Sequence, residues 1–137
     1  MATVSCRYLG DLRVECVHEA SGTKIITDAP LDNHGKGESF SPTDLCVTAL
    51  ASCAMTIIGI LGQNHGIDVS GTRLEVLKIM SSKPPRRIGR IEVIFHMPDR
   101  DYSDKEKQMI ERAAHTCPVH LSLHDDVDQV FIFNWAR

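Results

Sequence analysis

The stretch SPTDLCVTALASCAMTIIGILG, residues 41–62, decides the fold of this chain. Ser41 stands where a helix N-cap is expected, Pro42 fits the first helical position, and Asp44 can complete a capping box. The 18 residues that begin at Leu45 carry no charge. The sequence therefore predicts one long helix, from Pro42 to about Asn64, that is apolar on nearly all of its faces.

This uncharged run approaches the length of a membrane span. It nevertheless contains Thr48, Ser52 and Thr56, and neither end has the aromatic or basic anchors that are typical of a membrane interface. A helix at the centre of a soluble core is also apolar on nearly all faces. We interpret the run as a central core helix, and we expect no membrane partner.

Length and composition favour one soluble domain that spans residues 1–137. The net charge of −3 provides no basis for binding nucleic acid. The N-terminal sequence MATVSCRYLGDLRVECV alternates polar and apolar residues and has no secretory h-region. Five cysteines in a chain without a signal peptide indicate a reducing compartment, so we expect a cytoplasmic protein.

Strand-like and helix-like segments alternate around the central helix. Gly10-Asp11 and Ser21-Gly22 are expected to form tight hairpin turns. The predicted strands are Thr3–Leu9, Leu12–His18, Thr23–Thr27, Thr72–Ser82, Ile88–Met97 and Gln129–Trp135. A capping box at residues 103–106 starts a second helix, and Pro118 starts a short third one. This order predicts an α+β fold with antiparallel strand pairing.

Two cysteines occupy positions that suggest a redox pair. Cys53 lies in the middle of the apolar helix, and Cys117 opens the phrase CPVHLSL, where the following proline places the thiol near a helix N-terminus that favours thiolate. Cys46 is about 10 Å from Cys53 along the helix, too far for a disulfide. Cys53 can equally be a small apolar residue of the core. We interpret Cys6, Cys16 and Cys46 as structural thiols.

A thiol in the middle of a helix gains nothing from the helix dipole, and burial raises its pKa. A reactive Cys53 therefore needs a nearby cation, and Arg7 and Arg13 on the N-terminal hairpin are the candidates. The pattern H-x-C-x-x-H-x-x-x-H at residues 115–124 could hold zinc. The proline after Cys117 opposes convergence of these four side chains, so we expect no metal.

The phrase S-P-T-D-L-x(7)-C, residues 41–53, resembles the peroxidatic cysteine segment of the osmotically inducible protein C and organic hydroperoxide resistance (OsmC/Ohr) family. CPVHLSL resembles the second cysteine segment of that family, and the order of strands and helices agrees along nearly the whole chain. The resemblance implies an OsmC-like α+β fold. In it, antiparallel sheets wrap around long central helices in an intertwined homodimer.

The resemblance also implies a thiol-dependent hydroperoxide reductase. Cys53 would be the peroxidatic cysteine that reduces an organic hydroperoxide, and Cys117 would resolve the sulfenic acid as a disulfide. A lipoyl-type or small dithiol would reduce this disulfide, and no cofactor is implied.

The chain departs from the family pattern before the helix. Peroxidase members have a Glu in an N-P-E phrase, where this chain has Thr43 followed by Asp44. The preceding loop contains Glu38 and no arginine. Glu38 and Asp44, with the two hairpin arginines, are therefore the candidates for supporting a thiolate. The departure points to a less characterised OsmC-like branch. It leaves open an alternative, a non-peroxidatic protein that binds a small apolar ligand in a cysteine pocket at the dimer interface.

Overall fold

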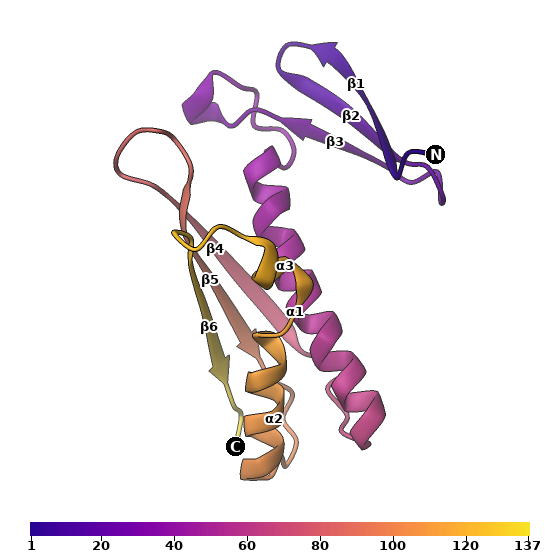
Figure 1. Cartoon of the computed structure of the whole chain (residues 1–137), viewed down its shortest axis with the longest axis vertical. Coiled ribbons are helices and arrows are strands. Elements are labelled where there is room, and N and C mark those ends of the chain that lie inside the picture. The colour runs from indigo at the N-terminus through magenta and orange to yellow at the C-terminus, as the bar shows by residue number, and fades with distance from the viewer. The chain divides into compact units, whose positions relative to one another are not determined.

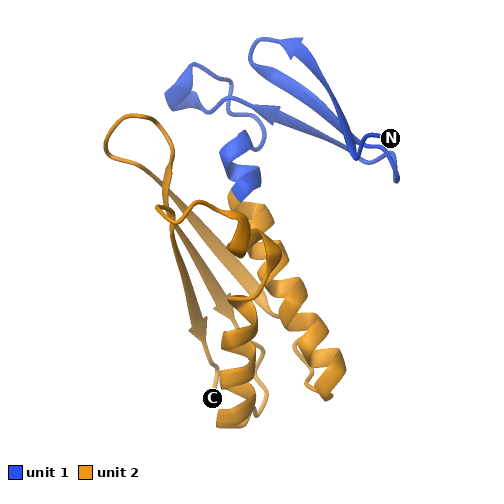
Figure 2. Cartoon of the chain, in the orientation of Figure 1, with its two compact units in different colours: residues 1–46 blue, residues 47–137 orange.

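The computed structural model describes residues 1–137 and contains two compact units, residues 1–46 and 47–137 (Figure 2). The single domain expected over the whole chain stays a prediction. The helices and strands, in chain order, are β1 (Val4–Gly10), β2 (Arg13–His18), β3 (Lys24–Asp28), η1 (Leu31–Asn33), α1 (Pro42–His65), β4 (Arg73–Met80), β5 (Ile88–His96), α2 (Asp104–Ala114), α3 (Pro118–Ser122) and β6 (Asp128–Asn134) (Figure 1). All six predicted strands and all three predicted helices are present.

The first unit contains a three-stranded antiparallel sheet in the order β1-β2-β3. The turn between β1 and β2 differs from the expected one, because Gly10 pairs with Arg13 and the two residues of the turn are Asp11 and Leu12. Both have positive φ, 54° and 62°, as a type I′ turn requires. Leu12, predicted to begin the second strand, therefore belongs to the turn. A bulge between Tyr8 and Gly10 accommodates this shift of one residue.

Helix α1 begins with the predicted capping box. The Ser41 amide donates to Asp44 Oδ2 at 2.9 Å, and the Asp44 amide donates to Ser41 Oγ at 3.0 Å. These two bonds give side-chain acceptors to the Ser41 and Asp44 amides, which have no backbone acceptor within the helix. At the other end, Gly66 follows the last helical residue with φ 66°, the left-handed conformation that glycine adopts without a steric penalty.

The second unit contains a three-stranded sheet in the order β4-β5-β6. Strands β4 and β5 are antiparallel, but β5 and β6 are parallel. The expectation of purely antiparallel pairing is therefore wrong for β6. The reason is the connection: the chain passes through α2 and α3 between β5 and β6, and such a helical crossover returns the second strand in the same direction.

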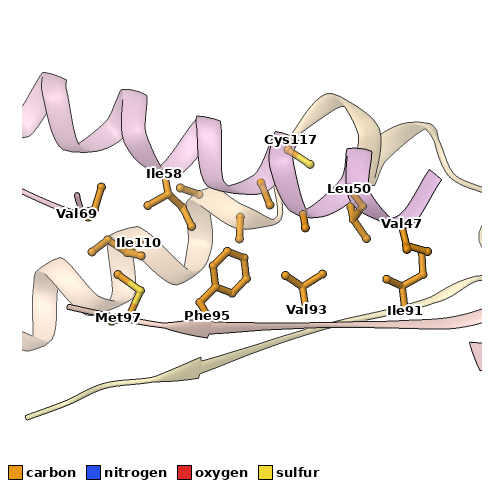
Figure 3. Close-up of a cluster of buried hydrophobic side chains, with 14 of the residues drawn as sticks. Val47, Leu50, Ile58, Val69, Ile91, Val93, Phe95, Met97, Ile110 and Cys117 are labelled. Atoms are coloured by element: carbon orange, nitrogen blue, oxygen red, sulfur yellow. The ribbon is translucent and has the colours of Figure 1, made fainter. Parts of the chain in front are cut away.

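The core of the second unit lies between this sheet and the helices (Figure 3). On β5, alternate side chains face the helices, and Ile91, Val93 and Phe95 are fully buried. Leu50 and Ile58 of α1 are equally buried in the same cluster. The fully buried or nearly buried members of α2 and the segment after it are Ile110, Ala113, Ala114 and Cys117. The second predicted cysteine is thus part of this core.

Candidate functional site

Cys53 and Cys117 come from different elements of the second unit. Cys53 lies in the middle of α1, is half-buried, and packs against the core cluster. Cys117 is fully buried, and Figure 3 shows its sulfur beside α1. One thiol is therefore partly accessible to solvent, while the other is enclosed by the core.

The chain conformation around Cys117 follows from its sequence. Pro118 cannot continue α2, and it occupies the first position of α3, which makes Cys117 the N-cap with an extended backbone (φ −70°, ψ 142°). The His120 amide donates to Cys117 Sγ at 3.3 Å. The predicted position of the thiol at a helix N-terminus is confirmed.

The structure brings the two thiols together. The thiol of Cys117 interacts with that of Cys53 closely enough to raise the pKa of Cys117. Two neighbouring thiols need only a local movement to form the S–S bond of about 2.05 Å. The two cysteines chosen from sequence context are therefore neighbours, although 64 positions separate them in the chain.

The environment of Cys117 favours the protonated thiol over the thiolate. Burial raises the pKa of this thiol above the ordinary value, and the interaction with Cys53 raises the pKa further. The amides of His120 and Val119 act in the opposite direction without reversing the shift. The expectation that the helix N-terminus favours thiolate here is therefore wrong in its net effect, because desolvation of the buried sulfur outweighs the amide donors.

This raised pKa predicts how the formation of a disulfide between Cys117 and an oxidised Cys53 depends on pH. Because the pKa of Cys117 is raised, the thiolate fraction at neutral pH is low and grows about tenfold per pH unit below that pKa. Disulfide formation from a Cys53 sulfenic acid should therefore accelerate from pH 7 to pH 9. Stopped-flow measurement after one equivalent of hydroperoxide would follow this step. A rate that is independent of pH over this range would contradict the prediction.

A second group of charged residues lies in the first unit. Arg13 binds Asp28 in a bidentate manner, with Nε–Oδ1 2.7 Å and Nη2–Oδ2 2.8 Å. The Asp28 side chain is 1% exposed, and the Glu38 amide donates to its Oδ2 at 3.1 Å. The Glu38 carboxylate lies 3.6 Å from Arg13 Nη2. The hydrogen bond from Arg13 lowers the pKa of Asp28, so the carboxylate stays ionised and the guanidinium is held in one orientation.

The other predicted residues have different surroundings. Asp44 belongs to the capping box of α1. Arg7 is exposed on β1, where its pairing partner on β2 is Glu15. The structure thus groups Arg13 with Glu38 and adds Asp28, which sequence reasoning missed. The available signal was an acidic residue at the end of a strand two residues before Pro30.

The histidines around Cys117 are arranged as an aromatic cluster. The rings of His115 and His120 lie with centroids 5.5 Å apart, and both pack on Phe131. His120 Nδ1 is 2.7 Å from Gln129 Oε1. Burial, and then the neighbouring His120, lower the pKa of His115. No group of three or more His, Cys, Asp or Glu side chains is placed to hold a metal ion.

An apolar groove of about 430 Å³ runs between α1 and α2. It starts near the thiols, because Ile57 follows Cys53 by one helical turn and Thr116 directly precedes Cys117. Arg112 contributes the one charged side chain to its lining. The other lining residues are Ile60, Leu61, Asn64, Met109 and Ala113.

Comparison with solved structures finds this fold repeatedly. A candidate osmotic stress induced and detoxification response protein from Psychrobacter arcticus is 45% identical, with a TM-score of 0.92 over 98% of this chain and 96% of that chain. The organic hydroperoxide resistance protein OsmC of Legionella pneumophila is 15% identical, with a TM-score of 0.76 over 96% and 94% of the two chains. OhrB of Bacillus subtilis is 16% identical, with a TM-score of 0.72 over 98% of each chain. The last two show likeness of fold alone.

A search of curated protein sequences finds no significant match. The profile of the OsmC-like protein family matches residues 35–129, which include α1, both cysteines of the thiol pair and all of α2 and α3. The match extends over more than half of the chain, and the 45% identical structure covers nearly all of it. The chain therefore belongs to the OsmC-like protein family.

Proposed function

We propose that this protein is a thiol-dependent hydroperoxide reductase with Cys53 as the peroxidatic and Cys117 as the resolving cysteine. One observation carries the proposal: a half-buried thiol on the central helix interacts with a fully buried thiol from a distant part of the chain. The accessible sulfur suits attack on a substrate, and the enclosed sulfur suits resolution. Similarity to an osmotic stress induced and detoxification response protein supports the same role.

The proposed cycle has three steps. The Cys53 thiolate attacks one peroxide oxygen, the O–O bond breaks, and the leaving alkoxide takes a proton to become an alcohol. The sulfur of Cys117 then attacks the Cys53 sulfenic acid, water leaves, and a disulfide forms. A lipoyl-type or small dithiol reduces this disulfide by two successive thiol–disulfide exchanges. The cycle needs no metal or organic cofactor, and it suits a reducing compartment such as the cytoplasm.

Arg13 is the proposed cation for the Cys53 thiolate. Its guanidinium is preorganised by a bidentate bond to the buried Asp28, whereas Arg7 is exposed on an edge strand. Asp28 would thereby keep this guanidinium in one orientation. Glu38 adds a second carboxylate near the same guanidinium.

The apolar groove supports an organic hydroperoxide as the substrate. Its lining includes Ile57, one helical turn after Cys53, and Thr116, directly before Cys117, and it can bury an alkyl or aryl group by the hydrophobic effect. Hydrogen peroxide has no such group. The proposal therefore includes a preference for organic hydroperoxides over hydrogen peroxide.

The proposed active form is an intertwined homodimer with α1 at its centre. An 18-residue window of α1 has a mean hydropathy of 2.1, yet only 33% of it is buried by its own chain. By length and composition α1 could cross a membrane, a test that core helices of soluble proteins also meet. A second copy would cover the exposed apolar positions of the helix, such as Ile60, which is 48% exposed.

Light scattering of the wild-type protein at micromolar concentration should give the mass of a dimer. Ile60→Asp should shift the population towards monomer, because it places a charge in the buried interface. Lys105→Asp, on the exposed start of α2, is the matched control and should leave the dimer intact. A monomeric wild-type protein would contradict the proposal.

The direct test uses reduced wild-type protein and one equivalent of cumene hydroperoxide. The expected products are one equivalent of cumyl alcohol and one disulfide per chain, located by peptide mapping between Cys53 and Cys117. Formation of alcohol without this disulfide would overturn the assigned resolving role. Absence of both would favour the alternative, in which the groove of about 430 Å³ binds a small apolar ligand and the thiols are structural.

A further inference from the structure

The N-terminal sheet contains a second pair of thiols. Cys6 on β1 and Cys16 on β2 are direct pairing partners, and their sulfur atoms lie 3.4 Å apart. Both residues were interpreted from sequence as structural thiols. Their placement instead resembles that of the pair in the core, but in a different unit and on different elements.

The type of strand pairing at this position allows a disulfide. The Glu19 amide donates to the Thr3 carbonyl at 3.1 Å, which marks a hydrogen-bonded pair of the β1–β2 ladder. Hydrogen-bonded and non-hydrogen-bonded pairs alternate, and Cys6–Cys16 lies three pairs further along. It is therefore a non-hydrogen-bonded pair, where Cα atoms are about 4.5 Å apart, inside the disulfide range of about 4.4–6.8 Å.

A backbone hydrogen bond between β2 and the β3 side also indicates that Cys6–Cys16 is a non-hydrogen-bonded pair. The His18 amide donates to the Thr23 carbonyl on the β3 side at 2.8 Å. Successive residues of a strand direct their backbone groups to alternate sides, so Cys16, two residues earlier, also bonds toward β3. Its backbone is thus not engaged with Cys6, and only the side chains of the two cysteines meet.

The pair differs from Cys53 and Cys117 in its access to solvent. Cys6 is exposed on an edge strand, and Cys16 is half-buried. The hydrogen bond with Cys6 raises the pKa of Cys16 above its ordinary value, with burial as the second cause. An external reagent therefore meets Cys6 first, while Cys16 is the internal thiol that follows.

We propose that Cys6 and Cys16 form a second thiol–disulfide site, which small disulfides oxidise to a cross-strand disulfide. The Cys6 thiolate attacks a disulfide RS–SR, releases one RS⁻, and forms a Cys6–SR mixed disulfide. The Cys16 thiolate then attacks Cys6 Sγ and releases the second RS⁻. In total, two protein thiols are oxidised, one RS–SR is reduced to two RSH, and the reverse reaction restores the dithiol.

The oxidised site would join β1 covalently to β2 across the hairpin turn. The closed loop contains the strained Asp11-Leu12 turn, so the bond would restrict opening of this edge of the sheet. The proposal uses neither Cys53 nor Cys117. It is therefore independent of the peroxidase proposal, and each can fail without the other.

The test is peptide mapping of the wild-type protein equilibrated in mixtures of reduced and oxidised glutathione, with remaining thiols alkylated. Trypsin cleaves after Arg7, Arg13 and Lys24, which places Cys6 in peptide 1–7 and Cys16 in peptide 14–24. A disulfide is then the one link between these two peptides. The expected result is that the joined peptides replace the separate alkylated ones as the proportion of oxidised glutathione rises, and that dithiothreitol reverses this.

Cys16→Ser separates the two chemical steps. This variant should accumulate glutathione on Cys6, whereas the wild-type protein should lose that adduct to the cross-strand disulfide. Cys46→Ser, which changes a cysteine outside the pair, should map like the wild type. Stable glutathione on Cys6 of the wild-type protein, or no reaction of either thiol at any glutathione ratio, would overturn the proposal.

Discussion

Replacing Cys53 with serine should abolish the turnover of cumene hydroperoxide. The hydroxyl of serine is not ionised at neutral pH and cannot form a sulfenic acid, so the first step of the proposed cycle is lost. The measurement is consumption of hydroperoxide by micromolar protein with dihydrolipoamide as reductant. The variant should show only the rate of the buffer and dithiol without protein.

The resolving position should behave differently from the attacking one. Cys117→Ser should consume one equivalent of hydroperoxide and then stop, with an oxygen atom trapped on Cys53 that dimedone can capture. Cys46→Ser is the matched control because it changes a cysteine on the same helix, seven positions earlier, and it should retain turnover. Equal rates for Cys53→Ser and the wild type would favour the ligand-binding alternative.

The same assay distinguishes the two hairpin arginines. Arg13→Ala removes the guanidinium that Asp28 orients, so the proposed support for the Cys53 thiolate is lost and the turnover of cumene hydroperoxide should fall. Asp28→Asn, which weakens the bond to Arg13, should lower the turnover by a smaller amount. A loss of turnover in Arg7→Ala and not in Arg13→Ala would transfer the supporting role to Arg7.

Phe95→Ala should cost about 3–5 kcal/mol in the free energy of unfolding. Phe95 is fully buried on β5, stacks on Phe133 with ring centroids 4.4 Å apart, and meets Phe131 edge-on at 6.0 Å. Truncation would leave a cavity between the sheet and α1 that surrounding side chains can fill only in part. Urea denaturation at a fixed protein concentration would measure the loss.

Leu77→Ala is the matched control for this prediction. Leu77 also lies in the second sheet, on β4, but is 42% exposed, so its truncation should cost less than about 1 kcal/mol. Similar losses for Phe95→Ala and Leu77→Ala would mean that the cluster around Phe95 does not form the stabilising core.

Local features of this fold could be predicted because nearby residues determine them. The capping boxes at Ser41–Asp44 and Ser103–Glu106 involve side chains and amides three positions apart, and both are present. The parallel direction of β6 could not be predicted in the same way. Its alternating side chains fit either direction, and the choice depends on how the crossover through α2 returns to the sheet.

The thiol pair of the N-terminal sheet was missed because of a shift of one residue. A turn at Gly10-Asp11 would place Cys6 opposite Glu15, whereas the observed turn and the bulge after Tyr8 place it opposite Cys16. Cys53 and Cys117 could be selected from the sequence because each lies in a distinctive local context. The raised pKa of Cys117 was not, since it depends on burial by residues far away in the chain.

The position of α1 in the chain has a consequence for biosynthesis. The helix ends at His65, but its core partners on β5 and α2 are synthesised later, up to Ala114. At about 5–20 residues per second, the nascent chain carries an apolar helix without these partners for several seconds. We therefore expect ribosome-bound chains that end between β4 and α2 to recruit chaperones that shield apolar segments, and completed chains to release them.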